Sequence, residues 1–593
     1  MRNTDIDKPD YFHKVVDCQW ACPTHTNVPE YIRMIAAGRY TDAFMLNWYS
    51  NVFPGILGRT CDRPCEPACR RARVEDKPVA ICRLKRVAAD LKGEFEHLLP
   101  EVPKKKNGKR IALIGAGPAS LTVARDLLPL GYECVLFEQE TLGGGMMRSQ
   151  IPAFRLPVEV LDEEVELVLD MGVECRFGQR IDSLKAVIDE GFDAVFVGTG
   201  APRGRDLDIP GRAEAADNIH IGVDWLASVA FGHTTRVGKR VVVVGGGNTA
   251  MDCCRSALRI GGKDVIVTVR SGFEEMKAHP WEKEEALAED IPILNWHNPH
   301  SFVVKDGRLT AMAFDKVRAE YTDGKRKLIP TGERVEIPCD DALLAIGQDP
   351  VFPWIEPELG IEIGKWSLPR LDPVTFESTR PGVFFGGDAA LGPDNIVSAA
   401  AHGHAAAISI DLHCQGKDQH KDRPSPGLNL VSQKMGLHEW GYGNDYDEAA
   451  RVAVPHAKKS AALANIKVEV ELGYDVKLAI EESARCLNCD VQTVFTPKLC
   501  IECDACVDIC PLDCINFTAN GEEEELRARL RVPADNESQD VYVDGPLPTG
   551  RIMAKDENLC LHCGLCAERC PTGAWDMQKS TIHLPQAGGL CHE

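Results

Sequence analysis

The sequence lacks long apolar stretches and has fewer basic than acidic residues. No run of 18 apolar residues occurs, so we expect no membrane-spanning helix. The N-terminus, "MRNTDIDKPDYFHKVV", is polar and lacks the apolar region of a signal peptide. Lys and Arg number 67 against 89 Asp and Glu, and the net charge of −22 would repel nucleic-acid phosphates. These absences predict a cytoplasmic protein that binds neither membrane nor nucleic acid. The acidic surface would suit a basic protein partner.

Cysteine, by contrast, is abundant and clustered. Of the 24 cysteines, six lie before residue 83, eleven lie from 486 to 570, and one lies at 591. Disulfides are rare in the cytoplasm, so clustered cysteines there indicate metal or iron–sulfur ligation.

The 593 residues suffice for three or four domains. Residues 1–100 are mostly helix-like with cysteine-bearing loops, and the lysine-rich stretch 103–110 is typical of a linker. From there to about residue 415, short β-branched runs alternate with helical stretches, which is typical of parallel sheets with helices on both faces. Residues 416–480 are polar and connecting, and residues 486–593 are rich in cysteine.

A first dinucleotide motif lies in "KRIALIGAGPAS". A predicted strand leads to Gly115, Gly117 and Ser120 and then to a helix, and the next strand ends at Glu138. Gly115 permits the tight turn, Gly117 lets a pyrophosphate approach the helix N-terminus, and Glu138 is placed to bind a ribose hydroxyl. Ser120 replaces the third glycine but is small enough for helix–strand packing. The alternative is an ordinary βαβ unit with glycines in its turn.

A second motif lies in "KRVVVVGGGNTAMDCCR". A strand over 241–244 leads to Gly245, Gly247 and Ala250, and the following strand ends in Val-Arg-Ser in place of an acidic residue. An arginine at this point can hold the 2′-phosphate of NADP, but only Arg270 is present. The motif therefore leaves NAD and NADP open.

Two copies of a ferredoxin motif, "CIECDACVDICP" and "CLHCGLCAERCP", occupy residues 500–511 and 560–571. Each reads C-x2-C-x2-C-x3-C-P, and in two-cluster ferredoxins the fourth cysteine of each copy ligates the other cluster. The sequence therefore predicts two [4Fe–4S] sites, and zinc is the alternative. Their ligands are Cys500, Cys503, Cys506 and Cys570 in one site, and Cys560, Cys563, Cys566 and Cys510 in the other.

The motifs "GAGPAS", "GGGMMRSQIPAFRLP", "VGTGA", "VVVVGGGNTAMDCCR", "AIGQDP" and "PGVFFGGDA", in this order, resemble the glutamate synthase small-subunit family of flavoproteins. That family is related to the flavin half of dihydropyrimidine dehydrogenase. The resemblance implies FAD at the first motif, NAD(P)H at the second, and Asp388 on the FAD ribityl chain. Motifs and resemblance together give the cofactor-binding set Gly115, Gly117, Pro118, Ser120, Glu138, Gly144, Arg155, Gly200, Gly245, Gly247, Asn248, Thr249, Ala250, Arg270, Gly347, Gly387 and Asp388.

The chain departs from the family pattern at two positions. The family often has two arginines where this chain has Arg270 and Ser271, which favours NAD over NADP. It usually has glycine before Ile-Pro where this chain has Gln150, a position expected near the flavin.

The six N-terminal cysteines match neither one cubane, which needs four ligands, nor two, which need eight. In the related flavoproteins a "RCLxC" pair precedes the equivalent of Cys18. Here that pair is found instead at 485–489 as "RCLNC". The resemblance therefore suggests one cluster on Cys18, Cys69, Cys486 and Cys489, and another on Cys22, Cys61, Cys65 and Cys82.

In the relatives the fourth ligand of the second N-terminal cluster can be a non-cysteine side chain of the same helix, and Cys82 lies one turn from Lys85. The alternative to four clusters is three, with either the pair or Cys18 and Cys69 unused. Most of the remaining cysteines are expected to be small buried apolar residues. They are Cys134, Cys175, Cys253, Cys254, Cys339, Cys414, Cys514 and Cys591.

NAD(P)H delivers two electrons at once, whereas iron–sulfur clusters accept one each, and a flavin does both. We therefore expect FAD between NAD(H) or NADP(H) and several [4Fe–4S] clusters, in a diaphorase-type subunit. Hydride transfer to FAD needs no acid–base residue, so no catalytic side chain is predicted.

The expected partner is a redox enzyme subunit or a free ferredoxin. Candidates are a 2-oxoacid:ferredoxin oxidoreductase, a benzoyl-CoA-reductase-type enzyme and a glutamate synthase large subunit. Two alternatives stay open: the small subunit of a glutamate synthase, or a non-enzymatic electron-relay or scaffold subunit with a decayed NAD(P) site. Ser271 and Gln150 support the second alternative, and the intact "GGGNTA" opposes it.

The expected fold class is α/β multidomain, with two nested Rossmann-like domains, a helical N-terminal iron–sulfur domain and a bacterial-ferredoxin-like α+β domain. The predicted ranges are 1–105 for the N-terminal iron–sulfur domain, 106–214 and 341–415 for the FAD domain, 215–340 for the inserted NAD(P) domain, 416–485 for a connecting segment, and 486–593 for the ferredoxin-like domain.

Overall fold

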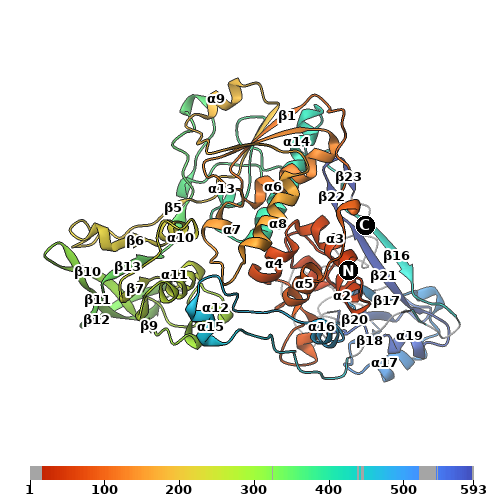
Figure 1. The fold of residues 1–593 in the computed structure, drawn as a ribbon. Coiled ribbons are helices and arrows are strands. Elements are labelled where there is room, and N and C mark those ends of the chain that lie inside the picture. Colours follow the sequence, from red (N-terminus) through yellow and green to blue (C-terminus); the bar gives the residue numbers. More distant parts are fainter. Residues whose placement is uncertain are drawn as a thin grey trace. The chain divides into compact units, whose positions relative to one another are not determined.

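The computed structural model describes residues 16–322, 325–436, 440–441, 446–519, 542–543, 545–557 and 559–590. The chain forms two compact units. The first, here called the cysteine unit, comprises Met1–Leu99, Pro424–Val454 and Gly473–Glu593. The second, the nucleotide unit, comprises Pro100–Arg423 and Pro455–Leu472. The two units alternate along the chain, so neither is one continuous segment (Figure 1).

The first sheet of the nucleotide unit is parallel, with strand order β15-β4-β1-β2-β3. Its strands are β1 (Arg110–Ile114), β2 (Glu133–Glu138), β3 (Glu174–Phe177), β4 (Ala194–Val197) and β15 (Val383–Phe385). The apolar residues of β1, β2, β4 and β15 are buried on both faces, as parallel sheets between helices require, whereas Phe177 of the edge strand β3 is exposed. The associated helices are α6 (Pro118–Leu127), α7 (Met146–Ser149), α8 (Val158–Leu169), α9 (Leu184–Asp189), α13 (Asp388–Leu391) and α14 (Ile396–Cys414).

Helices α6 and α14 pack closely because of one glycine. A Cβ on Gly403 of α14 would lie 2.7 Å from the carbonyl oxygen of Ala119 on α6. The Asn395 side chain caps α14 by accepting the Ser398 N–H at 2.8 Å. The absence of a side chain at Gly403 therefore lets α14 pack closely against α6.

The second sheet is also parallel, in the order β6-β13-β7-β8-β9. It consists of β6 (Ile219–Ile221), β7 (Arg240–Val244), β8 (Asp264–Val269), β9 (Ile293–Asn295) and β13 (Asp341–Leu344). Helices α10 (Gly222–Ala230), α11 (Asn248–Arg259) and α12 (Pro280–Ala288) accompany it. An antiparallel sheet of β10 (His297–Lys305), β11 (Arg308–Thr322) and β12 (Lys325–Pro338) follows β9 in the chain, and α15 (Lys459–Ala464) also belongs to this unit.

The boundary between the two nested parts differs from the prediction. Residues 341–344 were expected to open the second FAD segment, but β13 pairs with β6 and β7 of the second sheet. The chain leaves that sheet only afterwards, where β14 (Gln348–Asp349) pairs with β5 (Arg203–Gly204). A short buried apolar strand suits either sheet, so its local sequence cannot assign it to one of them.

In the cysteine unit, the N-terminal part is helical. Its helices are α1 (Asp17–Trp20), α2 (Val28–Ala36), α3 (Tyr40–Asn51), α4 (Pro54–Thr60) and α5 (Ile81–Asp90). The C-terminal part adds α16 (Val476–Ser483), α17 (Ala505–Ile509) and α19 (Leu565–Arg569). Its sheets are β16-β21-β17 and β18-β20-β19, built from β16 (Gly427–Ser432), β17 (Val491–Phe495), β18 (Ile515–Thr518), β19 (Tyr542–Val543), β20 (Ile552–Lys555) and β21 (Trp575–His583), and β22 (Pro585–Gln586) pairs with β23 (Gly589–Leu590).

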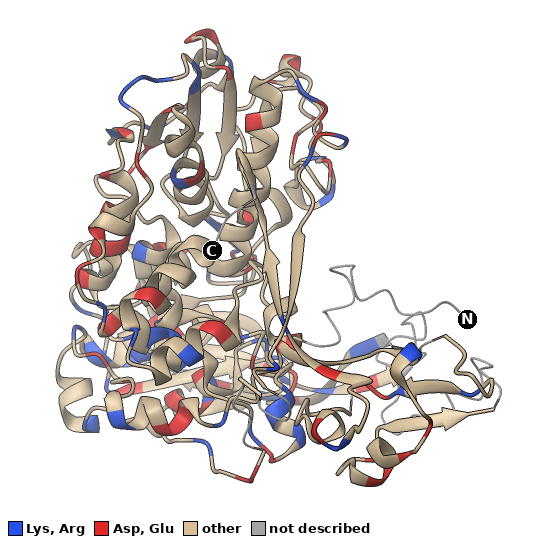
Figure 2. Cartoon of the chain, turned by 90° about the vertical axis from the view of Figure 1, so that its right-hand side faces the viewer, with Lys and Arg blue, Asp and Glu red and all other residues tan. Residues whose placement is uncertain are grey.

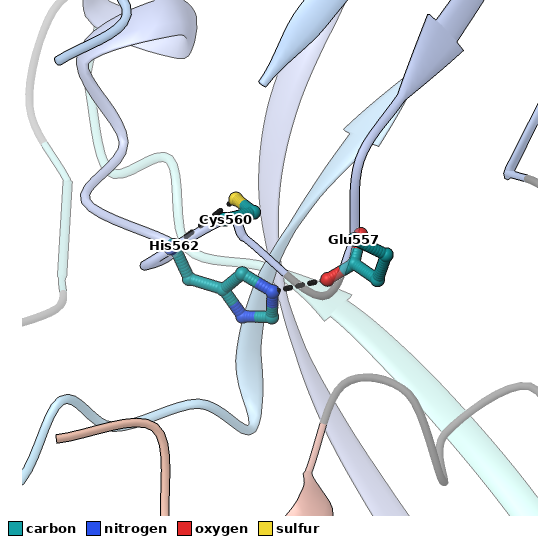
Figure 3. A group of neighbouring side chains, drawn as sticks. All are labelled: Glu557, Cys560 and His562. Atoms are coloured by element: carbon teal, nitrogen blue, oxygen red, sulfur yellow. Dashed lines mark hydrogen bonds and ion pairs between the residues drawn. The ribbon is translucent and has the colours of Figure 1, made fainter. Parts of the chain in front are cut away.

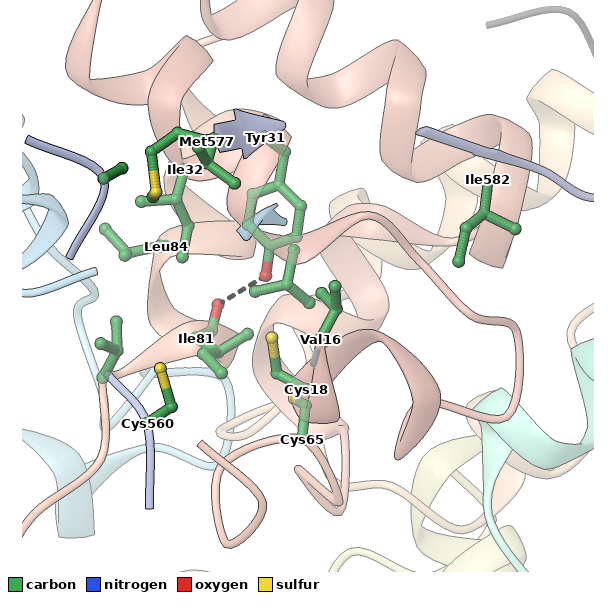
Figure 4. Close-up of a cluster of buried hydrophobic side chains, with 14 of the residues drawn as sticks. Val16, Cys18, Tyr31, Ile32, Cys65, Ile81, Leu84, Cys560, Met577 and Ile582 are labelled. Carbon is green, nitrogen blue, oxygen red and sulfur yellow. Dashed lines mark hydrogen bonds between the residues drawn. The ribbon is translucent and has the colours of Figure 1, made fainter. Parts of the chain in front are cut away.

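These two parts share one hydrophobic core, although the sequence suggested separate domains at 1–105 and 486–593. Tyr31, Ile32 and Leu84 of the N-terminal helices lie in the same cluster as Met577 and Ile582 of β21 (Figure 4). The Tyr31 hydroxyl donates to the Ile81 carbonyl at 3.1 Å. The N-terminal helices and the ferredoxin-like segment therefore form one folded body.

Acidic and basic residues are both scattered among the helices, strands and loops (Figure 2). None of the helices in the described ranges combines the length and apolar character that a bilayer crossing requires.

Candidate functional site

The first glycine-rich turn lies between β1 and α6. Gly115 has a φ of 93°, and a Cβ there would lie 2.7 Å from the Gly198 carbonyl oxygen, so only glycine fits. Gly117 is the N-cap of α6, and Pro118 occupies its first turn. The first N–H groups of α6 have no partner within the helix, so this end suits a pyrophosphate.

The serine in place of the third glycine is accommodated by another glycine. Ser120 is buried, and a Cβ added to Gly198 would lie 2.3 Å from Ser120 Oγ. The close helix–strand approach is therefore kept by Gly198, just beyond β4. Gly198 lies in the family motif "VGTGA", and no role was predicted for it from the sequence.

Glu138 is bonded to the turn that it was predicted to serve. Its Oε2 accepts the Ala116 N–H at 2.8 Å, and its Oε1 accepts the Glu140 N–H at 2.9 Å. Burial raises the pKa of this carboxyl despite those bonds. The carboxylate thus lies at the carboxyl end of β2, directly beside the β1–α6 turn.

Asp388 follows β15 at the same carboxyl edge of the first sheet, because β15, β4 and β1 are parallel neighbours. Burial raises the pKa of Asp388 to about 7, and its Oδ1 accepts the Asp394 N–H at 3.1 Å. Gly387, directly before it, has a φ of 59°. Glu138 and Asp388 are far apart in the sequence, yet both lie at the carboxyl edge of the first sheet.

The remaining predicted glycines divide between two places. The Gly144 N–H donates to the Ala116 carbonyl at 2.9 Å, and Gly200 lies against Met146 of α7, so both lie near the first turn. Gly347 instead lies against Arg205, beside the β5–β14 link.

Arg155 has partners that the sequence did not predict. Its guanidinium donates to both carboxylate oxygens of Asp252 at 2.8 Å and pairs with Glu282 at 2.5 Å. Burial tends to lower the pKa of Arg155, but these carboxylates raise it above the ordinary value. The charge of Arg155 is thus compensated by α11 and α12 of the second sheet. Gln150, expected near the flavin, donates to the Val223 carbonyl on α10 at 3.1 Å.

The second glycine-rich turn lies between β7 and α11. Gly245 has a φ of 150°, and a Cβ there would lie 2.1 Å from the Ala345 carbonyl oxygen. Gly247 is the N-cap of α11, which starts with Asn248 and Thr249, and Ala250 is fully buried behind the turn. Arg270 follows β8 and is exposed, whereas Ser271 is buried. An anionic ligand at this turn would meet both the start of α11 and the Arg270 charge.

In the cysteine unit, the "CLNC" pair lies among the N-terminal helices. Cys18, Cys69, Cys486 and Cys489 line one cavity. Burial raises the pKa of Cys18, and the neighbouring thiols raise it further. Arg33 of α2 fixes the pair by donating to Asn488 Oδ1 at 3.1 Å and to Asp490 Oδ1 at 2.8 Å.

A second N-terminal group gathers Cys22, Cys61 and Cys65 around the buried Lys85. Burial tends to raise the pKa of Cys22, but the Lys85 ammonium and hydrogen bonds from two threonines lower it overall. Burial tends to lower the pKa of Lys85, and the surrounding thiols raise it overall. The sequence predicted only that Lys85 lies one helical turn from Cys82.

Cys82, the predicted fourth ligand of this group, has its thiol bonded to helix α4. Its Sγ lies 3.2 Å from the Leu57 carbonyl oxygen and 3.4 Å from that of Gly58. Cys82 nevertheless belongs to this group, since it raises the pKa of both Cys61 and Lys85, and ligating iron would require its thiol to give up the bonds to α4.

The two ferredoxin motifs build two thiol-lined cavities. We call Cys500, Cys503, Cys506 and Cys570 the outer site, and Cys510, Cys560, Cys563 and Cys566 the inner site. Each takes its fourth cysteine from the other motif, as the spacing predicted. Cys514, expected to be only a buried apolar residue, also lines the inner cavity.

Charged residues surround the inner site. His562 Nε2 lies 2.5 Å from Glu557 Oε1 (Figure 3). Lys555 Nζ lies 2.7 Å from Glu557 Oε2. Burial tends to raise the pKa of Glu557, but Lys555 and His562 hold it well below the ordinary value. His562 Nδ1 lies 3.2 Å from the Cys489 carbonyl oxygen, so this histidine joins the inner site to the "CLNC" pair.

Arg70 makes a second connection between these sites. It follows Cys69 in the chain, is 2 % exposed, and donates to the Cys560 carbonyl at 2.8 Å. Its Nε pairs with Asp17 Oδ2 at 3.0 Å. The donor chemistry at all four sites is thiol sulfur, which fits iron–sulfur clusters.

Two glycine turns at the carboxyl edges of two nested parallel sheets, combined with thiol-lined cavities, define a pyridine-nucleotide-linked flavoprotein that carries iron–sulfur clusters. Residues 109–403 match the pyridine nucleotide-disulphide oxidoreductase family. Residues 13–96 match domain II of dihydropyrimidine dehydrogenase with its 4Fe-4S cluster, and residues 499–574 match the 4Fe-4S dicluster domain.

The chain belongs to the glutamate synthase small-subunit-like family of FAD- and NAD(P)-dependent iron–sulfur oxidoreductases. It is 34% identical over 506 residues to the NADP(+)-dependent formate dehydrogenase subunit beta of Moorella thermoacetica, covering 80% of this chain and 70% of that one. It is 32% identical over 522 residues to the NADPH-Fe(3+) oxidoreductase subunit beta of Geobacter sulfurreducens (82% and 77%). With the glutamate synthase [NADPH] small chain of Escherichia coli the identity is 30% over 416 residues (66% and 87%).

These matches confirm the predicted family, the oxidoreductase class and the cofactors FAD, NAD(P)(H) and [4Fe–4S]. They confirm the fold class at the level of an α/β multidomain protein with a Rossmann-like reductase and ferredoxin-type domains. The chain is thus an electron-transfer subunit of flavin and iron–sulfur type.

Proposed function

We propose that the chain passes electrons between NADP(H) and a partner redox subunit, in either direction, through FAD and four [4Fe–4S] clusters. The observation that carries this proposal is the gathering of Cys18, Cys69, Cys486 and Cys489 around one cavity. With that cavity, the cysteine unit contains four thiol-lined groups in one folded body.

The proposed ligand sets follow those groups. Cys18, Cys69, Cys486 and Cys489 hold one cluster, and the outer and inner sites hold two more. Cys22, Cys61 and Cys65 hold the fourth cluster, and its remaining ligand is Cys82 or a group that Lys85 attracts. Lys85 offsets the negative charge of this site, since thiolate ligands and a buried ammonium attract each other.

In the nucleotide unit we assign FAD to the β1–α6 turn and NADP(H) to the β7–α11 turn. Glu138 and Asp388 hold hydroxyl groups of FAD at the edge of the first sheet. Bound FAD supplies the exchange between two-electron and one-electron transfer. The protein positions its cofactors and contributes no acid–base residue.

We assign NADP(H) in preference to NAD(H), although Ser271 in place of a second arginine pointed the other way. Arg270 is exposed at the carboxyl end of β8, where a 2′-phosphate would lie. The relatives from Moorella, Geobacter and Escherichia coli are named for NADP(+) or NADPH. Both facts support NADP(H).

We propose that the chain acts in the cytoplasm. We propose a redox subunit as its partner, since relatives are subunits of a formate dehydrogenase and a glutamate synthase. A 2-oxoacid:ferredoxin oxidoreductase, a benzoyl-CoA-reductase-type enzyme, a glutamate synthase large subunit and free ferredoxin remain the candidate partners. Co-purification of the tagged chain from its native source, followed by electron transfer assays with the recovered subunit, identifies which one it is.

Anaerobic titration of the purified chain with NADPH and NADH tests the nucleotide assignment. We expect NADPH to bleach the flavin absorbance and to support viologen reduction. Replacing Arg270 by Ala should raise the KM for NADPH about tenfold, the worth of one charge-assisted contact, and leave the KM for NADH unchanged. The matched control is Arg240→Ala, at the amino end of β7, which should change neither value.

The titration also separates the candidate functions. A preference for NADH that Arg270→Ala does not alter would contradict the NADP(H) assignment. If neither nucleotide bleaches the flavin, the chain is a relay or scaffold subunit and the oxidoreductase proposal fails.

A further inference from the structure

The inner site contains one thiol more than a cubane needs. Cys514 lines its cavity together with the four proposed ligands, whereas Ala574 occupies the equivalent place at the outer site. The two motifs correspond residue by residue, since Cys514 follows Cys510 by the same four positions as Ala574 follows Cys570. Cys514 is therefore one point at which the two sites differ chemically, and a second is Thr572 of the outer site, whose inner counterpart is Leu512.

The Cys514 thiol contacts ligand sulfur directly. Its Sγ lies 3.3 Å from Cys510 Sγ, and Cys560 lines the same cavity. The backbone N–H of Cys514 donates to Cys510 Sγ at 3.4 Å, and that of Ala574 donates to Cys570 Sγ at 3.2 Å. Both sites thus have the backbone donor. The inner site adds the Cys514 thiol, and the outer site has the Thr572 hydroxyl, which lies 3.7 Å from Cys570 Sγ.

The direction of the bond follows from the chemistry of the ligands. A cysteine sulfur that binds iron carries no proton, so Cys510 and Cys560 can only accept. Cys514 is buried, with 3 % exposure, and must therefore be the donor. Its alanine counterpart at the outer site indicates that this position is not needed to complete a cubane.

We propose that Cys514 is a non-ligating positioning thiol that donates its S–H to the ligand sulfur of Cys510 and raises the reduction potential of the inner cluster. Hydrogen bonds to ligand sulfur stabilise the reduced, more negative form of a cluster. The inner site is also the one joined to the "CLNC" pair through His562, so its potential affects how electrons divide between the two parts of the unit. The proposal rests on the ligand sets proposed above.

The test is an anaerobic redox titration of the full chain, followed by EPR, with iron and sulfide counted. Cys514→Ala gives the inner site the residue that the outer site has at the equivalent position. We expect the iron content to stay unchanged. The reduction potential of one cluster should fall by about 59 mV, which is a tenfold shift of its one-electron equilibrium toward the oxidised form. Cys514→Ser keeps a donor and should fall between wild type and alanine.

The reciprocal variant, Ala574→Cys, adds the donor to the outer site and should raise the potential of the other cluster. It decides the question if Cys514→Ala does not fold. Loss of about four iron atoms in Cys514→Ala would make Cys514 a ligand and overturn the proposal. Full iron with unchanged potentials in both variants would also overturn it. Flavin bleaching by NADPH, which neither variant should affect, tells this failure from failure of the proposed function.

Discussion

The outer and inner sites are two copies of one motif placed in two different environments. Both begin their short helix after a residue with positive φ, Asp504 at 58° and Gly564 at 80°. In both, a backbone N–H two residues after the first cysteine donates to its sulfur, from Glu502 at 3.3 Å and from His562 at 3.4 Å. The C-x2-C loop is local, so its geometry repeats wherever its sequence does.

The surroundings do not repeat. Ile501 of the outer site is 62 % exposed, whereas its counterpart Leu561 is 6 % exposed. Cys503 is exposed, whereas Cys563 is half-buried. The inner site is bonded to Arg70 and to the "CLNC" pair, and the outer site faces solvent. The motif thus determines where the ligands stand, and distant parts of the chain determine the environment of the cluster.

The largest expected effect comes from removing the pair that adjoins the inner site. Cys486→Ser/Cys489→Ser should lower the content from about sixteen to about twelve iron atoms, because one cubane loses two ligands. The measurement is anaerobic iron and acid-labile sulfide per chain. Cys175→Ser, in the nucleotide unit, is the control and should keep all the iron. Equal iron in the double variant and wild type would remove the pair from the ligand sets.

The parts of the candidate site that a sequence can predict are local patterns. Ligand spacing in "CIECDACVDICP" and "CLHCGLCAERCP" and the glycine turns at Gly115 and Gly245 are short-range features, which a sequence displays directly. The "RCLNC" pair could be assigned only through resemblance, because its partners Cys18 and Cys69 lie more than 400 residues earlier.

The rest depended on long-range packing. The sequence suggested separate domains at 1–105 and 486–593, yet Tyr31 and Met577 share one core. Arg155 lies in a motif shared with the family, but its partners Asp252 and Glu282 come from helices of the second sheet. Cys514 looked like one of several spare thiols, and only its 3.3 Å approach to Cys510 distinguishes it.

A smaller effect is expected from the arginines of the two sites. Arg70→Ala should cost about 3–5 kcal/mol of folding stability, because it leaves Asp17 and two buried carbonyl oxygens without their cation. Arg551 at the outer site pairs with Asp504 at 2.8 Å near the surface. Its replacement by Ala should cost about 0–1 kcal/mol.

Denaturant unfolding of the two arginine variants, each with its iron content, checks this contrast. If both variants lose the same free energy of unfolding, the contacts between the inner site and the N-terminal helices contribute little to stability. A lysine at position 70 serves as a further control, since it keeps the charge and loses the planar set of donors.

The last contrast concerns one pair of equivalent aliphatic residues, Leu561 and Ile501, and it includes the smallest expected effect. Leu561→Ala should destabilise the unit by about 2–5 kcal/mol, because a buried side chain leaves a cavity. Ile501→Ala should change stability by less than about 0.5 kcal/mol, since its side chain is already in water. If Ile501 lies where a redox partner docks, Ile501→Ala should slow electron transfer to that partner and leave viologen reduction unchanged. A stability loss in Ile501→Ala as large as that in Leu561→Ala would show that the outer site is covered in solution, and the contrast between the two sites would then be wrong.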